Sequence, residues 1–444
     1  MWWNNSCFYH IHPMTYFAAP AYNDFSSPPT PRLNLLYETI GQIRDLGCNA
    51  LYLGPLFEST SHGYDTVDYY HVDRRLGDDR QLKDLIGHLH GMGVKVVIDG
   101  VFNHVGRNFW AFHDLRTKGP ESPYRGWFRG VNFRQNNAFG DGFRYKGWEG
   151  HESLVSLNLN NPDLRNHILK AVQWMIEDLA IDGLRLDVAY MLNREFMAEL
   201  SAFCKERRDD FFLLGEMIHG NYTDLVNGKL LNSVTNYSAY KGLWSSHNDH
   251  NLFEIAHTLS NQFGEYGTCR NLSLLNFADN HDVDRLASQL KKSEHLYTLY
   301  TILFTMPGIP SIYYGSEWQA KGRRTSKSDA ALRPPWHAIE QKDPTLFRHI
   351  QKLTEIRQDN PWLATVPYRQ LHIQNEELAF IRQGPNSDIV TALNISDKDK
   401  KIKFPLPKAQ TFNVLAGRGR IEKAQGNEIT LAMPSAGHLV LSSG

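Results

Sequence analysis

The sequence is poor in cysteine, carries no excess of either charge and contains no long apolar run. Its four cysteines, Cys7, Cys48, Cys204 and Cys269, are far apart and form no CxxC pair. This pattern argues against a disulfide framework or a thiolate metal site and favours buried, reduced thiols. The formal net charge of −1 offers no general attraction to nucleic acid or to an anionic membrane, so neither is expected as a partner.

Segments that would target the chain to a membrane are also missing from the sequence. No apolar run reaches the roughly 18 residues of a membrane-spanning helix. The start of the chain lacks the basic and then apolar stretch of a secretory signal. We therefore expect a cytoplasmic protein whose hydrophobic fraction of 41% supports a sizeable core.

Short strand-like runs alternate with helix-period runs up to about residue 360. One helix is expected over residues 33–46, ended by Gly47, and another begins with Asn161 as N-cap and Pro162 in the first turn. Seven or eight such units favour a closed (β/α)8 TIM barrel, an α/β fold, over an open doubly wound sheet. The strand candidates are Phe8–Ile11, Ala50–Leu53, Val94–Ile98, Gly183–Leu186, Phe211–Leu214, Leu274–Phe277 and Ser311–Tyr314.

Two stretches interrupt this rhythm and divide the chain. Residues 104–160 are rich in Gly, Asn, Arg and aromatics, and so long a loop without structure is improbable in a compact domain. We assign them to an inserted B domain, between barrel segments 1–103 and 161–365. Residues 366–444 show alternating segments separated by turn residues, which predicts a C-terminal antiparallel β domain.

Carboxylates follow several of the predicted strands, where catalytic groups of such barrels lie. Asp187 ends a buried strand, and Arg185 two residues earlier lies on the same side of it. We expect this arginine to keep the pKa of Asp187 low, as a nucleophile requires; a purely structural ion pair is the alternative. Glu216 follows an apolar run, where burial would raise its pKa and let it donate a proton; a solvated strand-end Glu is the alternative.

A further polar cluster, Asp279-Asn280-His281-Asp282, follows another strand. These groups suit a polyhydroxylated ring, with Asp282 ionised and His281 donating hydrogen bonds, although a metal site is a rival interpretation. Asp99 follows the third strand and either holds the neighbouring arginine or is architectural. His104, close by, can bind a sugar hydroxyl.

Together these groups predict two or three convergent carboxylates whose pKa values are pushed apart. A carboxyl pair about 5–5.5 Å apart hydrolyses glycosides with retention through a covalent glycosyl-enzyme.

The ordered set of motifs resembles the α-amylase family, glycoside hydrolase family 13. The stretches 99–104, 183–189, 214–216 and 277–282 are similar to its four main conserved regions. The resemblance covers about residues 8–360. It implies the TIM barrel, the inserted B domain and a C-terminal β-sandwich.

The resemblance also implies a role for each site residue. Asp187 matches the nucleophile, Glu216 the general acid/base, and Asp282 the third carboxylate, which binds sugar hydroxyls and stabilises the transition state. The positions that match substrate-binding residues are Tyr64, which would stack on the sugar before the cleaved bond, His104, Arg185 and His281.

Within the family, the motifs are most similar to the cyclomaltodextrinase, neopullulanase and maltogenic amylase types. Those enzymes usually carry a β-sandwich before the barrel that is often used for dimerisation, whereas this sequence begins almost at the first strand. A homodimer therefore stays open. Asn103 matches a calcium ligand of many relatives, so structural calcium is open too, while the chemistry itself requires no cofactor.

The expected function is retaining hydrolysis of α-1,4-linked gluco-oligosaccharides, either short maltodextrins or cyclic dextrins, with Asp187 as the glycosylated residue. Alternatives are a transglycosylase of the same family and an α-glucosidase acting on short α-1,6-linked oligosaccharides. A non-catalytic carbohydrate-binding protein would lack catalytic carboxylates, and a metal-dependent barrel hydrolase would lose activity to a chelator and regain it with a divalent ion.

Overall fold

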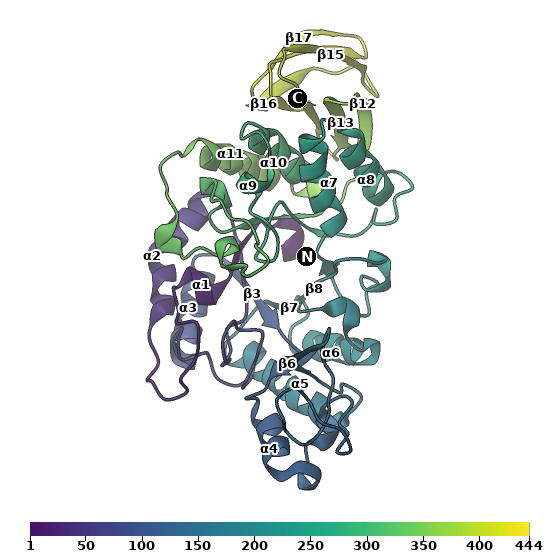
Figure 1. Ribbon diagram of the computed structural model, residues 1–444. Coiled ribbons are helices and arrows are strands. Elements are labelled where there is room, and N and C mark those ends of the chain that lie inside the picture. Colours follow the sequence, from purple (N-terminus) through teal and green to yellow (C-terminus); the bar gives the residue numbers. More distant parts are fainter. Residues whose placement is uncertain (444) are drawn as a thin grey trace.

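The computed structural model describes residues 1–443, and its centre is a barrel of eight parallel strands (Figure 1). The strands follow one another around the barrel in chain order, and a parallel bridge between Thr235 and Leu275 joins the two ends of the sheet. The predicted (β/α)8 barrel is confirmed. Its strands are β1 (Phe8–Ile11), β2 (Ala50–Leu53), β3 (Lys95–Gly100), β7 (Gly183–Leu186), β8 (Phe212–Gly215), β9 (Ser233–Val234), β10 (Leu275–Phe277) and β11 (Ile309–Tyr313).

One barrel strand, β9, was not predicted from the sequence pattern. It has only two residues, Ser233 and Val234, and no α-helix separates it from β8 among the described residues. So short a run shows no periodicity, and pairing with Leu214 and Gly215 of β8 makes it a strand.

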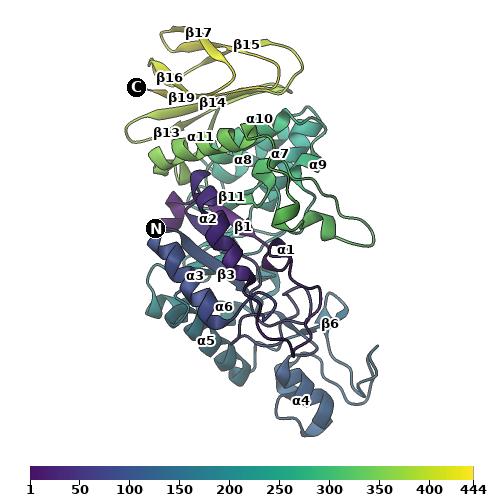
Figure 2. The same cartoon turned by 90° about the vertical axis from the view of Figure 1, so that its left-hand side faces the viewer.

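Helices cover the outside of the barrel (Figures 1 and 2). Two of the predicted helix ends are confirmed. Gly47 follows α2 with a left-handed φ of 88°, and the Asn161 side chain accepts the Asp163 and Leu164 backbone N–H groups at the start of α5. The covering helices are α2 (Leu35–Asp45), α3 (Asp79–Gly91), α5 (Pro162–Glu177), α6 (Arg194–Arg207), α7 (Tyr237–Asn248), α8 (Phe253–Phe263), α10 (His295–Thr305) and α11 (Thr345–Asp359), with short α1 (Pro13–Tyr16) and α9 (Leu286–Gln289) in loops.

The stretch 104–160 contains a helix and an antiparallel sheet of its own. The helix is α4 (Trp110–Lys118), and the sheet has the order β4 (His104–Gly106), β6 (His151–Ser156), β5 (Gly147–Trp148). Figures 1 and 2 show α4 at the end of the molecule opposite the C-terminal strands. The hairpin of β5 and β6 carries Trp148 to the wall of the cavity at the barrel mouth.

Two antiparallel sheets form the C-terminal β domain, as predicted. A buried apolar cluster lies between them and includes Ile381, Phe404 and Leu441. One sheet has the order β12 (Arg369–Ile373), β13 (Glu377–Gln383), β14 (Asp388–Asn394), β19 (Gly437–Ser443), β16 (Phe412–Gly417), and the other β15 (Lys400–Pro405), β18 (Glu428–Met433), β17 (Arg420–Gln425).

A buried arginine ties this domain to the barrel. Arg382 of β13 is fully buried and donates to the carbonyls of Thr305 at 2.6 Å and Leu363 at 2.7 Å, and also to Val366. Thr305 ends α10, and Leu363 and Val366 follow α11, so all three carbonyls belong to the barrel. Arg382 therefore joins the C-terminal domain to the barrel backbone. Among residues 1–443, no helix has the length and apolar character needed to cross a membrane.

Candidate active site

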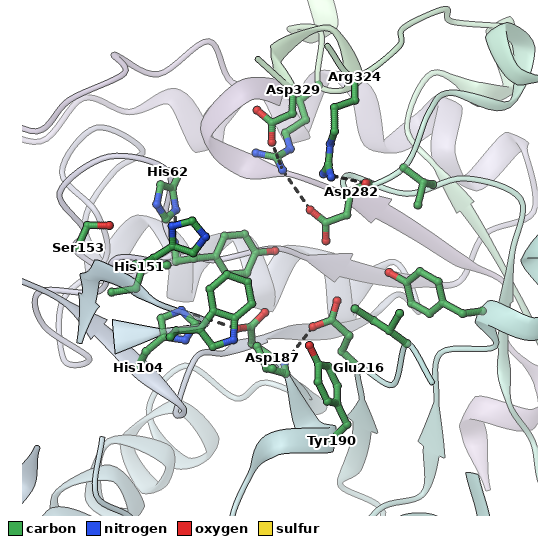
Figure 3. Close-up of a pocket in the computed structure, with 18 residues that line it drawn as sticks. His62, His104, His151, Ser153, Asp187, Tyr190, Glu216, Asp282, Arg324 and Asp329 are labelled. Atoms are coloured by element: carbon green, nitrogen blue, oxygen red, sulfur yellow. Dashed lines mark hydrogen bonds and ion pairs between the residues drawn. The ribbon is translucent and has the colours of Figure 1, made fainter. Parts of the chain in front are cut away.

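A cavity of about 660 Å³ opens at the carboxyl ends of the barrel strands (Figure 3). Five of the predicted site residues line it: Tyr64, His104, Asp187, Glu216 and Asp282. Arg185 and His281 lie beneath it, around a small inner cavity, and contact those carboxylates directly. The barrel thus brings together side chains that are more than 200 positions apart in the chain.

Arg185 is the hub that joins two of the three carboxylates. Its Nη1 lies 2.8 Å from Asp187 Oδ1, and its Nη2 lies 2.8 Å from Glu216 Oε1. Asp187 and Glu216 each directly follow a neighbouring strand, β7 and β8, and Figure 3 shows them side by side with their carboxyl groups toward Asp282. One planar guanidinium therefore fixes the relative position of both groups.

Glu216 is also held from the backbone. Its Oε2 accepts the Val188 N–H at 2.9 Å. Val188 has a φ of 49°, in the left-handed region that β-branched residues rarely adopt. The strained backbone at Val188, directly after Asp187, thus places its N–H within hydrogen-bond distance of the Glu216 carboxyl group.

Glu216 is buried, as predicted, and it is also paired with Arg185 and hydrogen-bonded by the Val188 backbone N–H. Burial nevertheless dominates and raises the pKa of Glu216, and Arg185 opposes that shift.

The prediction of a low pKa for Asp187 is wrong. Burial raises the pKa of Asp187 to about 7, and Arg185 offsets this only in part. The arginine is shared, because Asp99 also contacts its Nη1 at 3.3 Å and Glu216 its Nη2. One cation cannot keep three buried acids fully ionised, so the cluster retains a proton near neutral pH.

Asp282 faces this pair from the opposite wall. Its Oδ2 lies 3.0 Å from His281 Nε2, and its Oδ1 lies 3.1 Å from Arg333 Nη2. Burial raises its pKa, but His281 and Arg333 outweigh burial, so the pKa lies well below the usual range. Asp282 is therefore the carboxylate that stays ionised, as expected.

Tyr64 and His281 form one side of the site. Their rings stack with centroids 5.7 Å apart and 7° between their planes, and the Tyr64 hydroxyl lies 2.6 Å from His281 Nε2. This stack holds the imidazole against Asp282.

Two polar groups of the predicted clusters support the site from outside the cavity. Asp99 accepts a hydrogen bond from the Tyr52 hydroxyl at 2.8 Å and holds Arg185, and burial raises its pKa to about 6. Asp279 accepts from Ser316 at 2.7 Å and from the Leu286 backbone at 2.8 Å, so it orders the loop after β10.

His104 and Trp148 present buried nitrogens without a hydrogen-bond partner in the described chain, and His104 Nε2 lies 3.9 Å from Asp187 Oδ2. His104 Nε2 and Trp148 Nε1 both line the cavity wall, with ring centroids 5.6 Å apart. Burial lowers the pKa of His104 to about 3, so its imidazole is neutral. A ligand hydroxyl can satisfy such groups, which otherwise remain costly.

The side chains near Asn103 do not form a carboxylate-rich metal site. The Asn103 side-chain Nδ2 lies 3.4 Å from His104 Nδ1, and the Asn103 backbone carbonyl accepts the Leu157 N–H. Calcium prefers six to eight oxygen ligands with carboxylates among them. Over residues 1–443, no group of three or more His, Cys, Asp or Glu side chains is arranged so that it could hold a metal ion. Calcium at Asn103 stays a prediction.

Sequence reasoning missed several lining residues. Arg333 binds Asp282 and Asp329, and Arg324 donates to the Asp282 backbone carbonyl. Arg324, Asp329 and Arg333 come from the loop after β11, where no strand-end rule points to them. His12 was also missed; it does not line the cavity, but it directly follows β1 and packs on His281 with ring centroids 5.7 Å apart. The strand-end rule that found Asp187 could have found His12.

Three carboxyl groups and several groups able to bind hydroxyls lie together at the mouth of the TIM barrel. This arrangement is typical of a site that processes carbohydrates. Comparison of the sequence agrees: residues 33–341 match the family model "Alpha amylase, catalytic domain". The chain belongs to the α-amylase family of glycoside hydrolases.

Among curated relatives, a cyclomaltodextrinase of a Bacillus species is 30% identical over 88% of this chain and 73% of its own length. A maltogenic α-amylase of Bacillus acidopullulyticus is also 30% identical, over 84% of this chain. This chain spans only 62% of that relative. Each relative therefore contains sequence beyond the matched part.

Solved structures share the architecture. The protein Ttha1563 from Thermus thermophilus superposes with a TM-score of 0.85 at 28% identity, and the match covers 100% of both chains. A cyclomaltodextrinase structure reaches a TM-score of 0.87 at 26% identity and covers 100% of this chain and 78% of that one. The debranching enzyme from Nostoc punctiforme has a TM-score of 0.84 at 25% identity, covering 99% and 98%.

Proposed function

We propose that this chain hydrolyses α-1,4-linked gluco-oligosaccharides with retention of configuration, through a covalent glycosyl-enzyme on Asp187. The observation that carries the proposal is the shared guanidinium: Arg185 binds Asp187 and Glu216 at 2.8 Å each. Two carboxyl groups that bind the two terminal nitrogens of one guanidinium lie close together. A retaining pair requires such proximity, because its carboxyl groups are roughly 5–5.5 Å apart.

In the first step, Asp187 attacks the anomeric carbon while Glu216 gives its proton to the leaving oxygen. The bond to that oxygen breaks, and an ester to Asp187 forms. The raised pKa of Glu216 supports its role as the acid. Asp282, held ionised by His281 and Arg333, would bind sugar hydroxyls and stabilise the developing positive charge.

In the second step, Glu216 removes a proton from water, and the oxygen of that water attacks the same carbon. The ester breaks and Asp187 is regenerated. Tyr64 and His104 would position the sugar, by stacking and by a hydrogen bond from the free His104 nitrogen. The printed names of the relatives, which include cyclomaltodextrinase and maltogenic amylase, support maltodextrins or cyclic dextrins as substrates. An "Intracellular maltogenic amylase" of Bacillus subtilis supports an intracellular location.

The roles of the two carboxylates can be separated by their substitutions. Glu216→Gln should lower kcat on maltotriose by about 10²–10⁴-fold. It should regain turnover on a glycosyl fluoride, whose leaving group needs no proton. Asp187→Asn should be inactive on both substrates. Equal rescue of the two variants would contradict the assignment, and Asp84→Asn, at an exposed position on α3, serves as the control.

A product profile decides between the substrate classes. Incubation with maltotriose, maltoheptaose, cyclodextrin, pullulan and isomaltose should release short products of α anomeric configuration from the α-1,4-linked substrates. Products longer than the starting sugar would favour transfer, and cleavage of isomaltose alone would favour the α-1,6 alternative. A β anomeric product would contradict retention.

A further inference from the structure

Two of the four cysteines lie side by side at the amino end of the barrel. All four are buried and free, and the sulfur atoms of Cys7 and Cys48 are 3.4 Å apart. Cys7 directly precedes β1, and Cys48 lies two residues before β2. The other two belong to different parts of the barrel, Cys204 on α6 and Cys269 in the loop after α8.

Hydrogen bonds of the backbone hold this pair in place. The Cys7 carbonyl accepts the Asn49 N–H at 3.2 Å, and the Asn49 side chain accepts the Cys7 N–H at 3.0 Å. The Cys48 N–H binds the Ile43 carbonyl at 3.2 Å, just after the left-handed turn at Gly47. Neighbouring strands lie about 4.8 Å apart, and a disulfide spans Cα atoms about 4.4–6.8 Å apart. A bond between the two thiols therefore needs little more than a movement of the sulfur atoms by about 1.4 Å toward each other.

The charged groups around the pair make the two thiols unequal. Burial raises the pKa of Cys48, and Cys7 and Glu317 raise it further. A cation lies on the side of Cys7, because Arg357 is buried there and its charge interacts with that of Cys7. The thiolate is the reactive form of cysteine, and it is better stabilised beside a guanidinium than beside a carboxylate. We therefore expect Cys7 to react first and Cys48 to react second.

Burial limits which oxidants can reach the two sulfur atoms. Cys7 is 3% exposed and Cys48 is 2% exposed. A bulky reagent has no access to such thiols, whereas a neutral molecule as small as hydrogen peroxide needs little room. The sulfenic acid that peroxide forms on a cysteine condenses with a nearby thiol to a disulfide. With a second sulfur at 3.4 Å, this condensation should outrun oxidation to the sulfinic acid.

We propose that Cys7 and Cys48 form an oxidation site, at which hydrogen peroxide converts the two thiols into a disulfide between β1 and the turn before β2. The Cys7 thiolate attacks one oxygen of the peroxide, the O–O bond breaks, and hydroxide leaves from the sulfenic acid that forms. The Cys48 thiolate then attacks the Cys7 sulfur, the S–S bond forms, and a second hydroxide leaves. The two hydroxides take up the protons of the two thiols, so two waters form, and the two sulfurs together give two electrons to the peroxide.

The disulfide would close a loop that contains the first strand and helix of the barrel. The two cysteines are 41 positions apart, and β1, α1 and α2 lie between them. A cross-link over such a loop removes conformational freedom from the unfolded chain and so stabilises the fold. The catalytic cavity opens at the carboxyl ends of the strands, on the opposite face, so the bond would not obstruct it. The proposal is independent of the reaction assigned to that cavity.

Treatment of the full-length protein with hydrogen peroxide, followed by thiol counting in denaturant, tests the proposal. The count should fall from four to two, and mass analysis of peptides should find Cys7 joined to Cys48. The thermal unfolding temperature should rise by about 4 °C, as a loop of this length in a chain of this size predicts, and dithiothreitol should reverse the rise. Four remaining thiols, a link to another cysteine or a link between two chains would each overturn the proposal.

Single substitutions distinguish this pair from the other cysteines. Cys7→Ser and Cys48→Ser should each keep all three remaining thiols after peroxide, and their unfolding temperatures should not respond to it. Cys204→Ser, at a buried position on α6, is the matched control and should fall from three thiols to one with the full rise in unfolding temperature. If the serine variants of the pair do not fold, Cys7→Ala and Cys48→Ala provide the same test. Loss of two thiols in any variant that lacks Cys7 or Cys48 would contradict the assignment.

Discussion

At the residue scale, the chemistry depends on one arginine shared by three buried acids. Arg185 contacts Asp99, Asp187 and Glu216, and all three carboxyl groups have raised pKa values because of burial. In the proposed mechanism, activity requires Asp187 to be ionised and Glu216 to be protonated, so burial and charge sharing would set its pH range.

The first prediction concerns the acid side of the pH profile. In the proposed mechanism Asp187 must be ionised to attack. Its pKa is raised to about 7, so kcat/KM should fall as pH decreases through 7. The charge of Asp99 contributes to this raised pKa. Asp99→Asn should therefore move the acid limb to lower pH, by about 1 unit. The measurement is kcat/KM on maltotriose from pH 4 to 9, and an acid limb that stays in place in Asp99→Asn would contradict the assignment.

At the scale of single elements, the strand β7 begins in a buried charge cluster. Asp182 precedes β7, is fully buried, and lies 2.7 Å from His90, 2.9 Å from Lys95 and 2.5 Å from Arg208. Burial raises its pKa, but hydrogen bonds from His90, the Val96 backbone and Lys95 outweigh burial and lower it. The cluster joins α3, β3 and α6 to the strand that carries Arg185.

The second prediction is that Asp182→Asn destabilises the protein by about 3 kcal/mol, because it leaves the charges of Lys95 and Arg208 facing a neutral group. The stabilisation by Asp182 is present above its ordinary pKa of about 3.9 and is lost as pH falls through its lower folded-state value. Urea unfolding at pH 7 measures the loss, and the difference from the wild type should shrink at strongly acidic pH. The exposed Asp84→Asn should change the free energy of unfolding by less than about 0.5 kcal/mol.

The β5–β6 hairpin is a second element with a role in the site. A Cβ atom on Gly147 would lie 2.2 Å from the His151 carbonyl oxygen, so only glycine allows the two strands to pair here. Trp148, the next residue, lines the catalytic cavity.

Gly147→Ala should therefore displace Trp148 and raise KM on maltotriose several-fold while the barrel remains folded. Steady-state kinetics and circular dichroism measure the two effects. Gly87→Ala on α3, where a Cβ would meet nothing within 4 Å, is the matched control and should leave KM unchanged. Equal KM values for the two variants would show that the hairpin does not shape the site.

At the scale of the whole molecule, buried histidines mark the interface between the barrel and the C-terminal β domain. A ring nitrogen of His295 on α10 donates to the Ile395 carbonyl at 3.0 Å, and the rings of His349 on α11 and His438 on β19 are 4.6 Å apart. Burial lowers the pKa of His349 to about 4 and of His438 to about 3. The interface thus requires neutral imidazoles.

The fourth prediction follows from the sign of these shifts. Between the ordinary histidine pKa of about 6.5 and the lower folded-state values, the unfolded chain binds more protons, so stability should fall as pH decreases below 6.5. Each such histidine contributes up to about 1.4 kcal/mol per pH unit. His438→Phe should make the acid-side slope of unfolding free energy against pH shallower, whereas replacing exposed His113 in the same way should not. An unchanged slope in His438→Phe would contradict the prediction.

Prediction from the sequence succeeded wherever a local pattern repeats. The seven strands with apolar runs, the Asn161 cap and the Gly47 helix end all lie where the pattern placed them, within one or two residues. The two-residue strand β9 was missed because its strand character comes from pairing with β8. Arg333 was missed because it lies in an irregular loop and only the closed barrel brings it to Asp282.

The sequence by itself determined which residue types follow which strands, and with them the barrel, the C-terminal β domain and the family, because periodicity and motif order are local properties of the chain. Only the tertiary structure decided how the charges are shared. Arg185 pairs with Glu216 as well as Asp187, and Asp187 has a raised rather than a lowered pKa. Burial depth and the number of acids around one cation depend on distances in space, which no spacing along the chain records.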